Sequence, residues 1–160
     1  MTHASITDIE DLPPLLARDA RLLGLDVGSK TIGMALSDVT RSVATPYDTI
    51  RRSKFTADAK TIREVVAKNQ VGALVIGLPL NLDGSEGPRA QSTRAFARNL
   101  AAHVEVPMVF WDERLSTAAV ERHLIEADVS RKRRAELVDR MAAAYILQGA
   151  LERLRRIPLR

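Results

Sequence analysis

Residues 22–38, LLGLDVGSKTIGMALSD, contain the pattern that decides the fold of this chain. An apolar run over residues 22–25 meets an acid, Asp26, and a second apolar run covers residues 32–36. Two such runs around a short glycine-bearing segment predict strand, tight turn and strand. A carboxylate at the end of a buried strand is costly unless a metal ion, a nearby loop or a cation such as Lys30 offsets its charge. Asp26 is therefore either a functional residue or a turn aspartate satisfied by its neighbours.

Outward from this stretch, the hydrophobic pattern changes between strand-like and helix-like periods. Loose alternation or a continuous apolar run indicates a strand, and apolar residues three and four apart indicate a helix. Thr56 is a candidate N-cap, and Pro88 suits the first turn of another helix. The expected strands cover residues 21–26, 32–38, 43–50, 73–78 and 106–111, and the expected helices begin near residues 56, 88, 116 and 130.

The order of these elements predicts an α/β fold with a mixed five-stranded sheet flanked by helices. Strands 21–26, 32–38 and 43–50 have short connections, so we expect an antiparallel meander. The later strands 73–78 and 106–111 each follow a helix, and such units place neighbouring strands parallel. We therefore expect both of them to run parallel to the first strand.

The length of 160 residues is typical of one domain. We expect that domain at residues 21–156, with residues 1–20 as an N-terminal extension and residues 157–160 as a tail. The chain has no cysteine, which excludes disulfides and thiolate metal sites. It has neither an apolar run near the ~20 residues of a membrane helix nor a secretory signal pattern. We expect a cytoplasmic protein with no membrane partner.

The charge is modestly basic and unevenly distributed. The net charge is +4 and the isoelectric point is about 9.8. Basic residues gather at residues 51–54, 131–134 and 153–160. Such clusters favour a polyanionic partner such as nucleic acid, although each one also fits an ordinary solvated surface.

Three acids are expected to meet at one edge of the sheet. Asp26 and Glu113 follow strands at their carboxyl ends, where open α/β sheets bind ligands. Asp139 lies near the start of a helix that should cross the same edge. Asp112 competes with Glu113, because neighbours on a strand face opposite ways.

Carboxylates without cysteine or histidine form a site for hard cations, which favours Mg²⁺ or Mn²⁺. Two such ions suit phosphodiester hydrolysis, because one activates water and the other stabilises the leaving oxygen. Lys30 or Arg114 would hold the scissile phosphate.

Four motifs in this order carry a family resemblance: GLDVGSKTIGMALSD, VIGLPLNLDGSEG, WDERLST and VDRMAAAYIL. Together they resemble the YqgF family of ribonuclease-H-like proteins, described as Holliday-junction-resolvase-like and as pre-16S ribosomal RNA nucleases. The resemblance covers residues 21–154 and implies a ribonuclease-H-like fold.

The resemblance also implies a catalytic, metal-binding carboxylate set at Asp26, Glu113 and Asp139. Many relatives in the wider superfamily carry an acid at the end of the fourth strand, where this chain has Asn81. The second carboxylate has therefore moved to Glu113 on the fifth strand. The expected substrate-binding residues are Lys30, Asn81, Arg114 and Ser116.

The leading functional hypothesis is a metal-dependent endonuclease, a hydrolase that trims the 5′ end of pre-16S ribosomal RNA with two Mg²⁺ or Mn²⁺ ions. The alternative is a Holliday-junction resolvase acting on branched DNA, which should be a two-fold dimer. The expected state is thus monomer or homodimer. A non-catalytic RNA- or transcription-associated module is a third hypothesis. An actin-like phosphotransferase is disfavoured, because that fold needs two domains.

Overall fold

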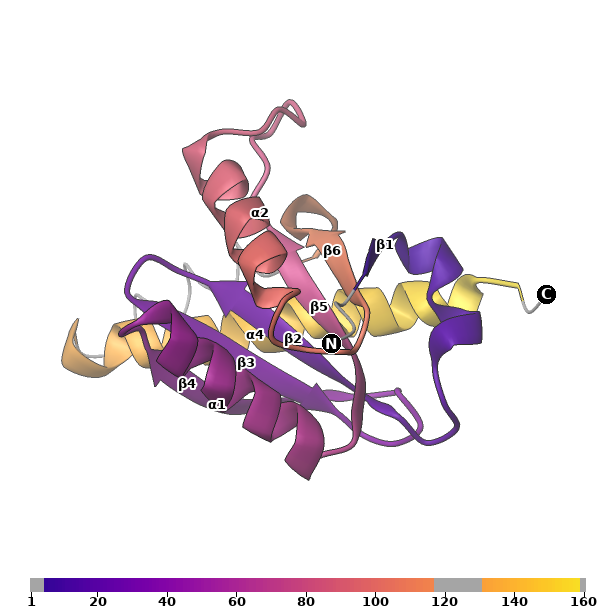
Figure 1. The fold of residues 1–160 in the computed structure, drawn as a ribbon. Coiled ribbons are helices and arrows are strands. Elements are labelled where there is room, and N and C mark those ends of the chain that lie inside the picture. The colour runs from indigo at the N-terminus through magenta and orange to yellow at the C-terminus, as the bar shows by residue number, and fades with distance from the viewer. Residues whose placement is uncertain (1–4, 117–130, 159–160) are drawn as a thin grey trace.

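The computed structural model describes residues 5–116 and 131–158, with side chains in the second range from residue 140 onwards. Three strands follow one another between residues 21 and 51, and helices alternate with strands after them (Figure 1). The strands are β1 (Ile6–Thr7), β2 (Arg21–Val27), β3 (Thr31–Ser37), β4 (Ala44–Arg51), β5 (Val71–Leu78) and β6 (Met108–Asp112). The helices are α1 (Phe55–Lys68), α2 (Pro88–Leu100) and α4 (Arg131–Arg156), with 3₁₀ turns η1 (Ile9–Asp11), η2 (Pro13–Leu15) and η3 (Glu113–Leu115).

The sheet is mixed, with the strand order β1-β6-β5-β2-β3-β4. Strand β3 pairs antiparallel with both β2 and β4. Strand β5 pairs parallel with both β2 and β6. The antiparallel meander and the two strands parallel to β2 are as the sequence predicts, and the carboxyl ends of β2, β5 and β6 lie at one edge.

A sixth strand corrects the prediction of five. Strand β1 lies inside the predicted extension and pairs parallel with β6, placing Ile6 opposite Met108. Leu12, between η1 and η2, is fully buried. A strand of two residues is too short to show an alternating pattern, so hydrophobic periodicity could not predict it.

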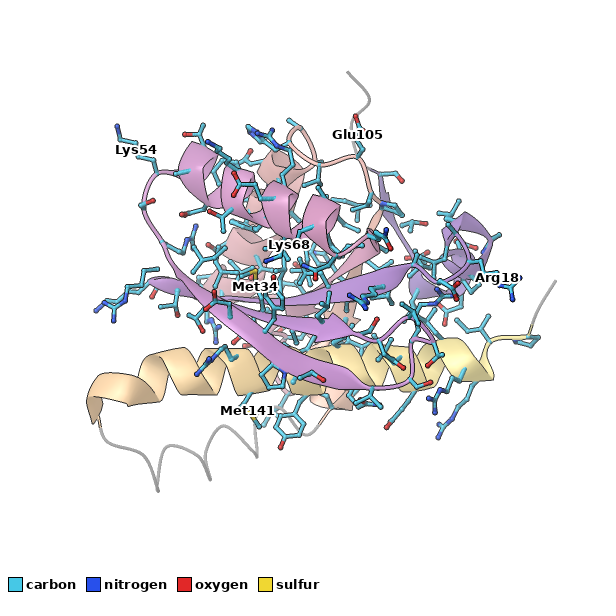
Figure 2. The ribbon with its side chains drawn as sticks, turned by 90° about the horizontal axis from the view of Figure 1, so that it is seen from below. Arg18, Met34, Lys54, Lys68, Glu105 and Met141 are labelled. Carbon is cyan, nitrogen blue, oxygen red and sulfur yellow. The ribbon has the colours of Figure 1, made fainter. Side chains whose placement is uncertain are left out.

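The core has two layers, one on each face of the sheet (Figure 2). Because side chains alternate along a strand, Leu23 and Leu25 face the layer under α1 and α2, whereas Leu22 faces α4. Gly24 allows α4 to approach closely, since a Cβ there would lie 2.8 Å from the Cβ of Leu147.

The buried stripe of α4 is displaced by one residue from the predicted one. Apolar residues three and four apart in this segment predict a stripe that includes Met141 and Tyr145, and both are only half-buried. The buried residues of this helix are Ala142, Ala143, Ala144, Ile146, Leu147, Ala150 and Leu151.

Helix α1 begins one residue before the predicted cap at Thr56. Its N-cap is Lys54, whose side chain makes no capping hydrogen bond. The buried Asp58 instead accepts hydrogen bonds from the backbone N–H and the hydroxyl of Ser53. The helix predicted over residues 116–127 lies outside the described residues. Of the helices that are described, none is long and apolar enough to cross a bilayer.

Candidate active site at the carboxyl edge of the sheet

Asp26 lies near the carboxyl end of β2, on the face that α4 covers, and its side chain is only 2% exposed. Its partner on β3 is Gly33. On the other side, Leu25 pairs with Ile76, so the next position on β5 beside Asp26 is Gly77. Glycine on both neighbouring strands leaves space above the sheet around this carboxylate.

The side chain of Glu113 reaches that space. Glu113 begins η3 directly after β6, and its Oε1 is buried. This oxygen lies 2.8 Å from the point that a Cβ on Gly77 would occupy. Gly77 belongs to the strand paired with β2, and paired strands are about 4.8 Å apart, so this oxygen of Glu113 lies over the strand next to Asp26, on the same face of the sheet. Two of the three predicted acids thus lie at one edge and on one face of the sheet.

The carboxylate of Asp112 forms a salt bridge with Arg114. The guanidinium donates to the Asp112 carboxylate from Nε at 3.1 Å and from Nη2 at 2.7 Å, and the Arg114 backbone N–H donates at 2.9 Å. The side-chain hydrogen bond lowers the pKa of Asp112 below its ordinary value and raises that of Arg114. Asp112 therefore serves as the cap of η3, whereas the Glu113 carboxylate lies over Gly77.

The third predicted acid, Asp139, belongs to α4, and its side chain lies outside those that the structure describes. Its position in the helix is four residues, about one turn, before Ala143, whose carbonyl lies against Gly24. No group of three histidines, cysteines or acids gathers to hold a metal among the side chains from residues 5–116 and 140–158. The complete metal set therefore stays a prediction.

The loop after β5 holds Asn81, which was expected to bind substrate. Its side-chain amide donates to the hydroxyl of Ser85 at 3.0 Å, and its backbone carbonyl accepts from the backbone N–H of Gly84 at 2.8 Å. Arg114 fastens this loop by donating from Nη1 to the carbonyl of Leu82 at 3.1 Å. Both Asn81 and Arg114 thus have structural partners that sequence reasoning did not include.

Ser116 and Lys30, the other expected substrate contacts, lie close to this edge. The hydroxyl of Ser116 donates to the carbonyl of Glu113 at 3.0 Å, which fixes the end of η3. Lys30 is exposed in the turn between β2 and β3. Arg52 holds that turn, because its Nη1 donates to the carbonyl of Gly28 at 2.7 Å and its backbone N–H donates to that of Lys30 at 2.8 Å. The sequence showed Arg52 only as part of a basic cluster.

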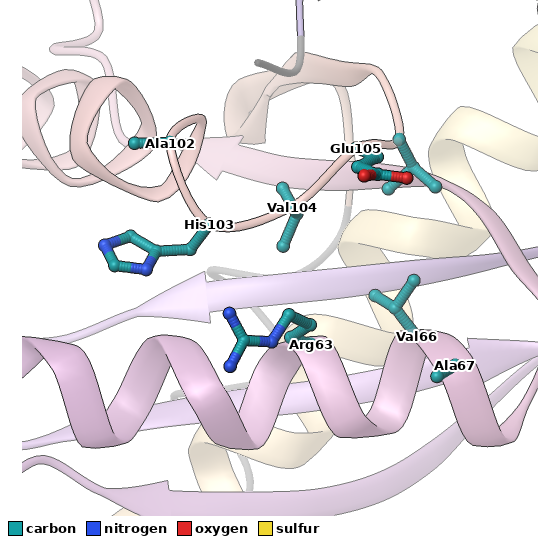
Figure 3. A pocket seen from close by; sticks show the side chains of 8 residues that line it. Arg63, Val66, Ala67, Ala102, His103, Val104 and Glu105 are labelled. Atoms are coloured by element: carbon teal, nitrogen blue, oxygen red, sulfur yellow. The ribbon is translucent and has the colours of Figure 1, made fainter. Parts of the chain in front are cut away.

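A mostly apolar pocket of about 410 Å³ lies at the other end of the sheet (Figure 3). Val66 and Ala67 of α1 and Val104 of the segment entering β6 line it. Its charged or titratable lining residues are Arg63, His103 and Glu105, so a single carboxylate lines it. The helix that follows one strand ends near the start of the next strand, and the parallel strands start at the edge of the sheet opposite to Asp26. The pocket therefore lies away from the candidate active site.

Comparison with known proteins identifies a matching family. The family model described as RuvX, Holliday junction resolvase, matches residues 20–153. A protein of Methylocella silvestris named "Putative pre-16S rRNA nuclease" is 62% identical over 154 residues, 96% of each chain. One of Paramagnetospirillum magneticum with the same name is 67% identical over 137 residues, 86% of this chain and 88% of the relative.

Solved structures share the fold at low sequence identity. The structure of T. thermophilus RuvC in complex with a Holliday junction substrate has a TM-score of 0.53 at 13% identity, covering 86% of this chain and 97% of that one. The yeast mitochondrial Holliday junction resolvase Ydc2 has a TM-score of 0.52 at 11% identity, covering 93% of this chain and 84% of that one. The predicted ribonuclease-H-like architecture is confirmed.

Proposed function

Because the chain belongs to the RuvX family, also called YqgF, we propose that it is a metal-dependent endonuclease that processes the 5′ end of pre-16S ribosomal RNA. The observation that carries the proposal is the juxtaposition of the buried Asp26 with Glu113 at the carboxyl edge of the parallel strands. Relatives that match nearly the whole chain have names that describe the same activity.

The donor set fits Mg²⁺ or Mn²⁺. Two like charges in a buried space repel each other, so a hard cation between them would stabilise both in the ionised form. Asp26 and Glu113 would hold the ions, with Asp139 as the third ligand. When bound, such ions activate water and stabilise the leaving oxygen.

Other residues around the candidate site would orient the Glu113 carboxylate and the substrate phosphate. Glu113 is oriented by the backbone of η3, which Ser116 and Asp112 hold at its two ends. Lys30, on the turn that follows Asp26, would bind a substrate phosphate through a charge-assisted hydrogen bond. Arg114 and Asn81 would shape the loop that borders the site rather than contact phosphate directly. A nuclease of ribosomal RNA precursors would act in the cytoplasm, where bacterial transcripts are made.

A resolvase activity on four-way DNA junctions is the second candidate, and the family description favours it. The two functions use the same chemistry but differ in assembly, because a resolvase must cut two strands symmetrically and should act as a two-fold dimer.

A cleavage assay on both substrates tests the proposal. Purified protein is incubated with a pre-16S 5′ leader and with a four-way junction, in Mg²⁺, in Mn²⁺ and in EDTA. We expect metal-dependent cleavage of the leader alone. Cleavage of the junction alone would establish the resolvase, and binding without cleavage of either would contradict the enzyme and favour a binding module.

A further inference from the structure

A second pocket, of about 430 Å³, opens at the same edge of the sheet as Asp26 but on the face that α2 covers. Val27 lines it, and since Val27 follows Asp26 on β2, the two side chains face opposite ways. The polar residues of the pocket come from the turn between β2 and β3 and from the first half of α2. They are Ser29, Lys30, Thr31, Arg89, Ser92 and Thr93.

The pocket is positively charged, because its charged lining residues are Lys30 and Arg89. Within the described part of the chain, neither Lys30 nor Arg89 has a carboxylate at ion-pair distance. Other arginines differ: Arg94 pairs with Glu86 at 2.6 Å and Arg153 pairs with Glu10 at 2.8 Å. The first turn of α2 also contains no acid, so the positive end of its dipole is not offset there.

The donors around the pocket match a tetrahedral anion. Lys30 and Arg89 supply charged N–H groups from two different elements, and the exposed hydroxyls of Ser29 and Ser92 beside them offer further donors. Arg52 keeps the turn in place, since it holds the carbonyls of Gly28 and Lys30 and stacks 5.3 Å above the ring of Phe96 in α2. Arg52 thereby joins the turn to α2.

We propose that this pocket binds a backbone phosphate of the nucleic-acid substrate, next to the phosphate that is cleaved. The inference rests on the proposed nuclease function for the identity of the strand. A strand crossing the edge of the sheet would pass from the carboxylates on the α4 face to the pocket on the α2 face. Arg89 and Ser92 thus join Lys30 as substrate-binding residues, and two anchored phosphates would fix the strand across the site.

Binding measurements in EDTA test the pocket without cleavage. The variant Lys30→Gln/Arg89→Gln is compared with Lys68→Gln/Arg98→Gln, which loses equal charge from the last turns of α1 and α2 at the opposite edge. The probe is the single-stranded pre-16S leader over a series of salt concentrations. We expect the pocket variant to bind the leader about 10-fold more weakly than wild type. The slope of its log binding constant against log salt concentration should be shallower by about 0.7, as for one lost phosphate contact on a single strand. The control should keep nearly wild-type values.

A backbone substitution assigns the effect to one phosphate. In oligonucleotides with a single neutral methylphosphonate at successive positions, wild type should show one position beyond the cleavage site that weakens binding, and the pocket variant should be insensitive there. Equal weakening in the pocket and control variants would overturn the proposal. If wild type cleaved the leader and the pocket variant bound it as tightly as wild type, the pocket proposal would be overturned and the proposed nuclease function would remain supported. A pocket effect without any cleavage would support the pocket and contradict the nuclease.

Discussion

Adding one methyl group at Gly77 should disable the site through Glu113. A Cβ at this position would lie 2.5 Å from Cδ1 of Ile146 and 2.8 Å from Oε1 of Glu113. Ordinary contacts begin at 3.4 Å, so the Glu113 oxygen must move by at least about 0.6 Å. Gly77→Ala therefore displaces one of the two neighbouring carboxylates without removing it.

The size of the effect follows from these contacts. Both crowded atoms are ends of flexible side chains, so we expect a stability loss of about 1–3 kcal/mol, typical of an overpacked core. For a domain of this length, that corresponds to a melting temperature lower by about 2–10 °C. Cleavage should fall more steeply, by about 10- to 100-fold, because reacting groups tolerate displacements of well under 1 Å.

Gly72→Ala is the matched control. Gly72 lies near the other end of β5, and a Cβ there would lie 2.7 Å from the Cβ of Ala20. A Cβ cannot rotate away, so this change should cost at least as much stability as Gly77→Ala. It lies far from the carboxylates and should leave cleavage per folded molecule unchanged.

Thermal melting and metal-dependent cleavage of the leader are measured on the same preparations. The reasoning predicts that both variants melt earlier and that only Gly77→Ala loses cleavage. If Gly77→Ala cut the leader at the wild-type rate per folded molecule, Glu113 would have no part in the chemistry. Equal loss of cleavage in both variants would mean that the effect comes from general destabilisation.

Two further predictions concern groups around the site and in the β3–β4 connection. Arg114→Lys should increase hydrogen exchange in the loop over residues 79–87, because a point charge cannot bond Asp112 and the Leu82 carbonyl together; unchanged protection of that loop would contradict this role. Hydrogen bonds from Thr40 and from the Val43 and Ser42 N–H groups lower the pKa of Asp38 from 3.8 to about 2. A carboxylate whose pKa is lower in the folded state stabilises the fold above pH 3.8, and this stabilisation is lost as the pH falls towards 2. The melting temperature of Asp38→Asn should therefore fall less between pH 3.8 and pH 2 than that of the wild type. An equal fall in both proteins would exclude a contribution of Asp38 to acid stability.

The order of the sheet could be predicted because it depends on rules that act over whole elements. Short connections fix the meander, and the handedness of strand–helix–strand units fixes β5 beside β2 and β6 beyond β5. The same rules place Asp26 and Glu113 at one edge. Strand β1 escaped prediction because two residues carry no pattern, and the fully buried Leu12 shows that the segment nevertheless belongs to the core.

The partners of the polar residues were harder to predict than their positions. Arg114 is predicted as a phosphate ligand, and the structure adds a partner that the prediction did not include, because Arg114 donates to the Asp112 carboxylate at the cap of η3. Arg52 looked like exposed charge, but it closes the turn beside Lys30. Such contacts depend on side-chain directions at the ends of elements, which hydrophobic periodicity does not encode. The glycines at positions 33 and 77 were a usable signal, because two of them beside an acid on a central strand indicate space above it.

The most direct test of the central claim is Asp26→Asn. This change keeps the size of the side chain and removes the charge that would hold the metal ions. Cleavage of the leader should fall by about 100-fold or more, while the melting temperature holds or rises, because a buried charge has been removed. Leader binding in EDTA should persist, since Lys30 and Arg89 are untouched. A folded, RNA-binding Asp26→Asn protein that still cuts the leader at the wild-type rate would contradict the assignment of this chain as a carboxylate-metal nuclease.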